Sequence, residues 1–505
     1  MPPTGAPATT TADPTAQADR TVFLKVVTST GPQQLDPARS TFPCDSDDLA
    51  LIYDTLIREQ PDGSYGPGLA ESWKTVDANT FELKLKANVK FQDGTAFNAQ
   101  AVKAALDRSR TLTTSTLAKP LAFISGVEAV DDLTVRLRLS EARAGTLPAL
   151  LADRAGMVPS PAAVAKDGDK YGANGAVGAG PYRYVELTPG THIKLERWDG
   201  YNDPKTQLLG GYESFGVSVQ FQVEQLKKGD LNYAALNEAS FPDVKKAADE
   251  GAIKYVVDPT TQYMQFFVNP GAAPFDDLRV RQALNFAIDR DAVNKAIAEG
   301  IGTIAWGPLP ASSWAHNKDV EGMYKYDPAQ AKKLLADAGY KDGLTIPTGM
   351  IQLPLYQRTT ELLQGMMAAA GFKLEIVPVP PAEINNRLYV TKDLKAAVTA
   401  FNASSDPGLA LEARFAKNGA NNPSGVVIAG LDALLTQGAA TTSQADRAKA
   451  YKDAELLVMK GAYEVPIYHF GGLVAFRPEM QNIVKGYTAC KGGNFLAPAI
   501  YALKK

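Results

Sequence analysis

The side chains that could carry catalysis or bind a metal are few and scattered in this chain of 505 residues. His192, His316 and His469 stand in unrelated contexts, and the chain has neither a His-Glu-x-x-His zinc helix nor a Gly-x-Ser-x-Gly nucleophile elbow. Carboxylates are abundant, but no pattern brings two of them together in an apolar pocket, as a glycosidase requires. The sequence therefore predicts no catalytic residue, no metal site and no cofactor.

The glycine-rich segment 172–180 invites comparison with phosphate-binding loops. Such a loop opens a helix and, in its commonest form, ends in Gly-Lys-Ser/Thr. Here the segment has no such ending, and the residues after it, 181–187, have the pattern of a strand. We therefore expect no nucleotide site.

The two cysteines, Cys44 and Cys490, lie near opposite ends of the chain. They form no Cys-x-x-Cys motif, which disfavours a structural zinc site. In an exported protein the pair could form one disulfide joining the two ends, and two buried thiols would fit the sequence equally well.

Bulk properties exclude several classes of function. Hydrophobic residues make up 45% of the chain and charged residues 21%, as in globular proteins, and the length predicts two or three structural units. A net charge of -3 provides no basic surface for nucleic acid or anionic lipid. No apolar run is long enough to span a bilayer.

The first 19 residues are mostly Pro, Thr, Ala and Gly, which predicts a disordered tether. They lack the basic start and apolar centre of a signal peptide. Our hypothesis is that a signal segment ending in a lipid-bearing cysteine was removed, and that Met1 stems from recombinant expression.

Residues 274–300 carry the clearest helical pattern. Asp276 or Asp277 can cap a first helix that turns Val280, Ala283, Leu284 and Ala287 inward and leaves Arg279 and Arg281 in solvent. Asp289 or Asp291 can cap a second helix that ends near Gly300.

Strands and helices alternate along the rest of the chain. Residues 22–27, 81–86, 133–139 and 373–377 are predicted as strands, and residues 49–56, 99–106, 328–338 and 355–370 as helices. Asp47 or Asp48, Asn98 and Asp327 are the expected caps of the first three helices. This alternation predicts an α/β protein with parallel βαβ layers.

The 274–300 string strongly resembles the most recurrent signature of the extracytoplasmic solute-binding proteins that feed peptide, nickel and opine ABC importers, bacterial solute-binding protein family 5. Further short motifs typical of this family follow in the expected order from about residue 22 to 502. One departure is the loss of the usual arginine ahead of Leu226. The other matching words are Leu35-Asp36-Pro37, Glu71-Ser72-Trp73, Gly178-Ala179-Gly180-Pro181-Tyr182, Leu226 to Leu231, Tyr326-Asp327-Pro328 and Val465-Pro466-Ile467-Tyr468.

The resemblance implies a two-lobed periplasmic-binding-protein fold of type II, in its large cluster with an extra scaffold subdomain and a ligand cleft between the lobes. We expect a tether at 1–19, a first lobe at 20–264 plus 477–505 with the scaffold at about 48–180, and a second lobe at 265–476. The implied function is the substrate-binding component of an ABC importer, which captures a small organic solute by lobe closure and delivers it to the permease. The protein would be an extracytoplasmic bacterial monomer, either periplasmic or a cell-surface lipoprotein held at the membrane through its lipid anchor.

The same resemblance places ligand contacts in loops of both lobes, although each residue could equally be a solvated loop or core residue. The candidates are Arg39, Thr41, Phe42, Asn237, Glu238 and Ser240 in the first lobe, and Tyr263, Trp306, Met350, Leu353, Tyr356, Phe401, Ser404 and Asp406 in the second. Trp306 could stack on a ring of the ligand or belong to the core.

Asp406 precedes a proline in a segment that resembles the place where relatives hold a peptide's α-ammonium, although Asp-Pro also opens turns. Matching dipeptide binders would also need an arginine within residues 349–356, and none is present. We therefore expect a longer peptide-like ligand or an apolar or aromatic molecule, and not nickel, because no histidines cluster. A solute-sensing receptor of the same fold is an alternative function, and a hydrolase the least favoured one.

Overall fold

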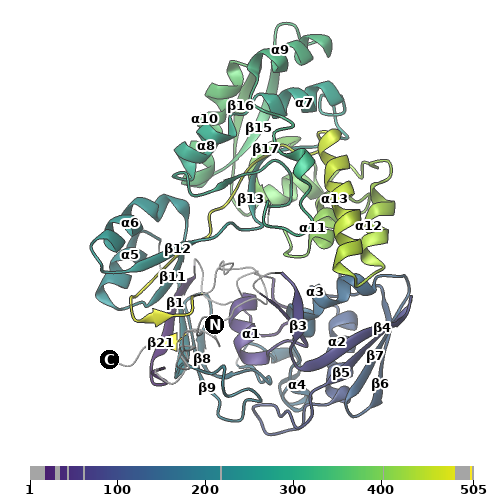
Figure 1. The fold of residues 1–505 in the computed structure, drawn as a ribbon, viewed down its shortest axis with the longest axis vertical. Helices are drawn as coiled ribbons and strands as arrows, with labels where there is room; N and C mark the ends of the chain where they lie inside the picture. The colour runs from purple at the N-terminus through teal and green to yellow at the C-terminus, as the bar shows by residue number, and fades with distance from the viewer. Residues whose placement is uncertain are drawn as a thin grey trace, which may run out of the picture.

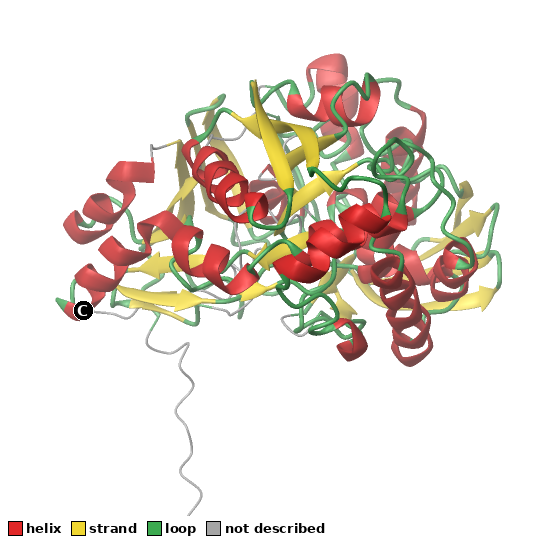
Figure 2. Cartoon of the chain, turned by 90° about the horizontal axis from the view of Figure 1, so that it is seen from above, coloured by secondary structure: helices red, strands yellow, loops and turns green. Residues whose placement is uncertain are grey.

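The computed structural model describes residues 18–28, 34–41, 45–60, 63–173, 175–216, 219–401, 403–483 and 501–502. Phe42, Cys44, Cys490 and most of the expected tether lie outside these residues, so the proposed disulfide stays a prediction. Helices and strands are interspersed throughout the molecule, as the alternating pattern predicts (Figure 2). No helix among the described residues is long and apolar enough to cross a membrane.

The described part of the first lobe contains two main sheets built from distant segments, beside a two-stranded sheet of β20 and β21 (Figure 1). The larger sheet has the order β1-β10-β9-β8, with β1 parallel to β10. The smaller sheet has the antiparallel order β11-β19-β12 and is flanked by α5 and α6. These elements are β1 (Phe23–Thr28), β8 (Tyr182–Thr188), β9 (His192–Arg197), β10 (Gly211–Gly216), α5 (Val219–Lys228), β11 (Tyr233–Leu236), α6 (Phe241–Asp249), β12 (Lys254–Val257), β19 (Leu473–Phe476), β20 (Met480–Gln481) and β21 (Tyr501–Ala502).

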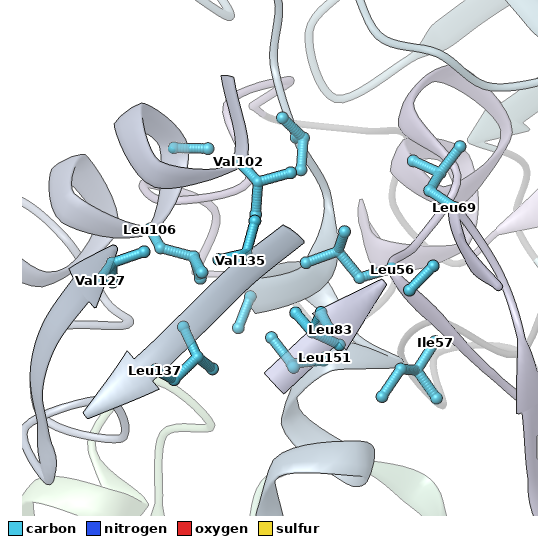
Figure 3. Close-up of a cluster of buried hydrophobic side chains, with 14 of the residues drawn as sticks. Leu56, Ile57, Leu69, Leu83, Val102, Leu106, Val127, Val135, Leu137 and Leu151 are labelled. Carbon is cyan, nitrogen blue, oxygen red and sulfur yellow. The ribbon is translucent and has the colours of Figure 1, made fainter. Parts of the chain in front are cut away.

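A scaffold unit extends the first lobe with an antiparallel sheet in the order β4-β5-β7-β6. Its inward-facing leucines and valines, from β5, β6, β7 and α2, point toward one another and form a separate core (Figure 3). Asn98 caps α2, as predicted. The elements of the scaffold are β2 (Ile57–Glu59), β3 (Tyr65–Pro67), β4 (Ala70–Asp77), β5 (Thr80–Leu85), α2 (Ala99–Thr111), β6 (Ile124–Asp131), β7 (Thr134–Leu139) and α3 (Leu147–Leu151). Helices α1 (Asp45–Tyr53) and α4 (Pro161–Asp167) contribute buried side chains to the core beneath the larger first-lobe sheet.

The second lobe is organised on a six-stranded sheet in the order β14-β18-β13-β17-β15-β16. β15 runs parallel to β16 and β17, whereas β13 runs antiparallel to β17 and β18. The elements are β13 (Tyr263–Val268), α7 (Leu278–Phe286), α8 (Arg290–Ile297), β14 (Thr303–Ile304), α9 (Pro328–Asp337), β15 (Leu344–Ile351), α10 (Pro354–Ala368), β16 (Phe372–Val379), β17 (Ala396–Phe401), α11 (Pro407–Phe415), α12 (Leu431–Ala439), α13 (Gln444–Lys460) and β18 (Pro466–His469).

Two chain segments, 258–262 and 470–472, connect the lobes side by side. Backbone hydrogen bonds join them, with Asp258 N donating to Gly472 O, Thr260 N to Phe470 O and Phe470 N to Gln262 O. Because β19 pairs with β11 and β12, residues 473–476 belong to a first-lobe sheet. Sheet membership thus favours a return point within 470–472, earlier than the expected one after residue 476.

The signature helices α7 and α8 form as predicted. Asp277 and Asp289 accept hydrogen bonds from Arg279 N and Ala292 N as the two caps, and the predicted inner face of α7 is fully buried. The prediction that Arg281 stays in solvent is wrong, because its side chain is only 5% exposed. Its guanidinium donates hydrogen bonds to the carbonyl oxygens of Phe275 and Gly461. The second bond gives a partner to the backbone carbonyl just beyond α13.

The first helix, α1, differs from its prediction at both ends. It spans Asp45–Tyr53, so Asp47 and Asp48 lie inside its first turn and do not precede it as caps. Leu56 lies beyond the helix and joins the scaffold core. The aspartates still meet the favourable end of the helix dipole from within the first turn.

Candidate ligand-binding site

The carboxyl ends of two parallel strands, β15 and β17, mark one edge of the second-lobe sheet. Strand register places Tyr263, at the start of β13, between Phe401 of β17 and His469 of β18. The Tyr263 ring lies 5.7 Å from that of Phe401 and 5.4 Å from that of His469. Open α/β sheets bind ligands beyond the carboxyl ends of their strands, so this edge is the natural place for a site.

The turn from β15 into α10 brings Leu353 and Tyr356 to the same edge. Leu353 occupies the cap position of α10 and remains 44% exposed, which is unusual for a leucine at the end of a buried strand. Tyr356 is half-buried, and burial raises the pKa of its hydroxyl. Met350, by contrast, is buried within β15 between Val398 and Pro378, so it supports the edge from inside.

Glu238 is the first-lobe candidate that contacts the segment crossing between the lobes. It begins a short 3-10 turn, Glu238–Ser240, after β11, and its side chain is only 4% exposed. Its Oε1 accepts a hydrogen bond of 2.9 Å from Gly471 N in the crossing segment. Burial raises the pKa of Glu238. Burial also raises the pKa of Tyr356 and of Tyr468 in the second lobe, and the charge of Glu238 adds to both shifts.

The neighbours of Glu238 in sequence face elsewhere. Asn237 and Ser240 line a polar surface groove of about 540 Å³ between α5 and α6. Arg39 pairs with Asp169 and Asp36 inside the first lobe, and Thr41 is an exposed loop residue. The structure thus brings Glu238 to the crossing segment, whereas the other first-lobe candidates lie elsewhere in that lobe.

Asp406 has partners for both carboxylate oxygens. Oδ1 accepts hydrogen bonds from Gly408 N and Leu409 N as the cap of α11, and Oδ2 accepts one of 2.6 Å from the Arg447 guanidinium. The side chain is 1% exposed, while Ser404 before it is exposed and its hydroxyl accepts from Asp406 N. In this arrangement Asp406 presents no free carboxylate, so its expected role as an ammonium acceptor stays an untested prediction.

Trp306 is half-buried against the cluster formed by α11, α12 and α13. The guanidinium of Arg290 lies 5.5 Å from the centre of its ring, a cation–π geometry. Burial lowers the pKa of Arg290 to about 10. Of the two roles predicted for Trp306, these contacts favour the core role.

A second junction joins the lobes away from the crossing segments. Ser405 Oγ donates a hydrogen bond of 2.7 Å to Glu59 Oε2 of β2, and Arg143 forms an ion pair with Glu412 of α11. A Cβ at Gly145 would collide with the carbonyl oxygen of Thr441, so the turn before α3 packs directly on the chain after α12. Among the described residues, the lobes therefore touch both at the crossing and at this junction.

The comparisons with known proteins agree with this architecture. Residues 64–422 match the sequence profile described as bacterial extracellular solute-binding proteins, family 5, middle. The chain belongs to bacterial solute-binding protein family 5. The predicted family and the predicted function, a substrate-binding component of an ABC importer, are thereby confirmed.

The relatives of this family 5 protein extend over most of its length. It is 31% identical over 414 residues to the glutathione-binding protein GsiB of Pectobacterium atrosepticum, covering 77% of each chain. It is 28% identical over 483 residues to heme-binding protein A of Haemophilus influenzae, covering 87% of this chain and 86% of the relative. The dipeptide-binding protein of Escherichia coli is 27% identical over 453 residues, with 83% of each chain covered.

Solved structures with the same fold include the substrate-binding protein CtaP of Listeria monocytogenes, with a TM-score of 0.82 at 21% identity over 96% of this chain and all of that one. The periplasmic binding protein DppA of Helicobacter pylori, solved with the peptide STSA, has a TM-score of 0.80 at 21% identity over 97% of this chain and 99% of that one. At such identities the similarity establishes the fold alone. The predicted two-lobed α/β binding-protein fold is confirmed.

Sequence reasoning did not single out three residues near the candidate site. Tyr468 lies in a segment that matches the family but was not named as a candidate, and no pattern pointed to Glu59 or Arg447. The uninterrupted apolar run 465–468 fits the fully buried strand β18 and gives no signal that separates Tyr468 from its neighbours. No group of three or more potential metal ligands occurs among the described residues.

Proposed function

We propose that this protein captures a peptide-like solute at the strand edge formed by Tyr263, Leu353, Tyr356 and Phe401, with Glu238 facing it from the first lobe. The observation that carries the proposal is the aromatic strand edge, where the Tyr263 ring lies 5.7 Å from that of Phe401 and Leu353 remains 44% exposed. Relatives named for binding glutathione and dipeptides support the peptide-like class.

An apolar or aromatic ligand is the second candidate. The exposed Leu353 beside Tyr356 would cover such a molecule, and one relative is named for binding heme. Both candidates share the same site and differ in the ligand chemistry.

Binding would act by shifting the balance between open and closed arrangements of the lobes. A ligand that contacts Tyr356 and Glu238 together binds the closed arrangement more tightly, and that difference in affinity drives closure. The Ser405–Glu59 and Arg143–Glu412 contacts join the two lobes and would stabilise the closed arrangement further.

We also propose that the protein works as a monomer beside the membrane, held by a lipid anchor, and presents the closed form to the permease. Fractionation of cells producing the native gene product would place it in the membrane fraction, and recovery in the soluble periplasmic fraction would contradict the anchor. Presentation to a sensor instead of a permease remains the alternative function, and accumulation assays in a permease deletion would separate the two.

A thermal-shift screen tests the ligand class. A ligand at one hundred times its dissociation constant stabilises the folded protein by about 2.7 kcal/mol, which raises the melting temperature by several degrees. The screen should compare di- to tetrapeptides, glutathione, opines, oligosaccharides, aromatic acids and heme. Shifts with oligosaccharides alone would contradict both ligand candidates, and release of a chemically altered ligand would revive a hydrolase.

Two matched variants test the location of the site. Leu353→Asp changes an exposed leucine at the site, and Leu278→Asp changes one that is 41% exposed at the start of α7. Aspartate suits both the cap position of α10, which Leu353 occupies, and the first position of α7, which Leu278 occupies, so neither variant should lose stability. We expect Leu353→Asp alone to weaken ligand binding, and equal affinities of the two variants would contradict the site.

A further inference from the structure

A groove at the outer end of the second lobe gathers positive charge. It has a volume of about 980 Å³ and lies between α9, the end of α10 and the turns that enter β15 and β16. These elements lie at the end of the second lobe that points away from the first lobe, with α9 at the top (Figure 1). Lys332, Lys333, Lys341 and Lys373 line this lysine groove, and Asp342 is the only carboxylate among its lining residues. The net charge of -3 gave no sign of the groove, because the four lysines come from three separate segments.

The four lysines have no partner within the described protein. None of them forms an ion pair or a side-chain hydrogen bond with another described residue. Lysines elsewhere in the described chain do pair with carboxylates, such as Lys103 with Asp107 and Lys245 with Asp249. The groove lysines also do not complement a helix dipole, since neither α9 nor α10 has a basic residue in its last turn. The lysine groove therefore holds positive charge that no described contact within the protein uses.

The lysine groove lies at the opposite end of the second-lobe sheet from the candidate ligand site. Leu344 and Phe372, the first residues of β15 and β16, line the groove, whereas Leu353 and Tyr356 follow the other end of β15. β15 has eight residues, and an extended chain of that length spans about 26 Å. The groove is thus a second surface and not a part of the ligand site.

We propose that the lysine groove binds the headgroups of anionic phospholipids and so holds the outer end of the second lobe on the membrane in which the permease lies. The inference goes beyond the proposed ligand site and does not depend on a lipid anchor. A component of an ABC importer acts beside a bilayer, so such headgroups are within its reach. Each lysine carries its ammonium on a flexible apolar stem, which can lie along Leu335 and Leu374 of the groove wall while the charge reaches a phosphate.

An acidic segment of another protein is the competing occupant. Carboxylates are bound best by arginine, whose planar fork donates two parallel hydrogen bonds, and no arginine is among the lining residues of the groove. Lysine acts on phosphate as a point charge, and each lysine close to an anionic bilayer strengthens binding about five-fold. The composition of the lysine groove therefore favours phospholipid.

Co-sedimentation with phospholipid vesicles tests the inference. The protein is the whole chain, purified without an acyl chain, and the vesicles contain phosphatidylcholine alone or with about 30% phosphatidylglycerol. A groove variant replaces Lys332, Lys333, Lys341 and Lys373 by glutamine, which keeps the helix propensity and removes the charge. A control variant makes the same replacement at four exposed first-lobe lysines that have no ion pair among the described residues, Lys90, Lys119, Lys166 and Lys170. Both variants lose the same charge, so a difference between them reports where the charge lies.

We expect the wild type to bind vesicles that contain phosphatidylglycerol and not those of phosphatidylcholine alone, and to lose this binding at about 0.5 M salt, where charges are screened. The groove variant should bind at least 20-fold more weakly than the wild type, and the control variant should stay within about 3-fold of it. A second variant, Lys341→Gln with Lys373→Gln, changes no helical residue and should show an intermediate loss. It keeps the test decisive if the substitutions in α9 disturb folding.

Three outcomes would overturn the inference. The first is no binding of the wild type to vesicles that contain phosphatidylglycerol. The second is equal weakening in the groove and control variants, which would show an effect of net charge alone. The third is binding of soluble polyglutamate by a wild type that leaves the vesicles unbound, which would assign the groove to an acidic polypeptide. None of these outcomes depends on the thermal-shift screen, so the proposed ligand site holds or fails independently.

Discussion

Replacing Asp406 by alanine should damage the second lobe before it affects a ligand. The substitution removes the cap of α11, which is bonded to Gly408 N and Leu409 N. It also leaves the guanidinium of Arg447, 4% exposed, without its carboxylate partner at 2.6 Å. Both losses fall on the described core between α11 and α13 and not on the strand edge.

The size of the effect follows from those two contacts. Loss of a helix cap costs about 1 kcal/mol, and removal of one partner from a buried ion pair costs about 3–5 kcal/mol. Together they predict a destabilisation of about 4–6 kcal/mol, or a fall of roughly 8–24 °C in melting temperature for a unit the size of the second lobe. Such a fall is large enough to lower the yield of folded protein.

Thermal unfolding followed by circular dichroism measures this effect, and two further variants divide it. Asp406→Asn keeps an oxygen for the cap and loses the charge, so it should retain about 1 kcal/mol relative to Asp406→Ala. Asp406→Asn combined with Arg447→Met removes both charges and should recover most of the remaining loss, because no unpaired charge is then left buried.

A different outcome would refute this reasoning. If Asp406→Ala melts within 2 °C or so of the wild type and peptide binding disappears in calorimetry, the carboxylate serves the ligand and the Arg447 pair contributes little. That result would restore the role predicted for Asp406 from the family resemblance.

Three further predictions concern other contacts. Trp306→Ala should lower the free energy of unfolding by about 2–3 kcal/mol in urea titration without changing ligand affinity, since a half-buried tryptophan loses less than a fully buried one; weaker binding at unchanged stability would show a ligand contact. Arg143→Ala should break the ion pair with Glu412 and increase the radius of gyration of the ligand-free protein in X-ray scattering, and an unchanged radius would show that the junction does not hold the lobes together. Burial acts to lower the pKa of His316, but the carboxylate of Glu455 outweighs it and raises the pKa, so the stability from this pair is complete below pH 6.5 or so and is lost as pH rises through the raised value. The melting temperature should therefore fall more steeply above neutral pH in the wild type than in His316→Gln, and equal slopes would contradict the assignment.

Local patterns in the sequence were sufficient to predict the type and position of most helices and strands named in advance. Caps and spacing act within one or two turns, so Asn98, Asp277 and Asp327 could be identified as helix starts from their own neighbourhoods. Arg281 could not be placed in this way. Its burial depends on the carbonyl of Gly461, which is 180 residues away in the chain.

The same limit explains the outcome for the site. The loop containing Glu238 was identified as a candidate, but its contact with Gly471 spans 233 residues of sequence. Asp406 was singled out for its position before a proline, whereas its partner Arg447 lies 41 residues further on. Local patterns thus located the loops, and only the tertiary fold decided which side chains are already paired.

Hydrogen–deuterium exchange with and without the ligand from the thermal-shift screen tests the central claim most directly. A ligand held between the lobes should slow exchange in residues 236–241, 353–358 and 468–472 together, because the proposal places the ligand against all three segments. Protection confined to the groove between α5 and α6, or to one lobe alone, would contradict the proposed site and its closure.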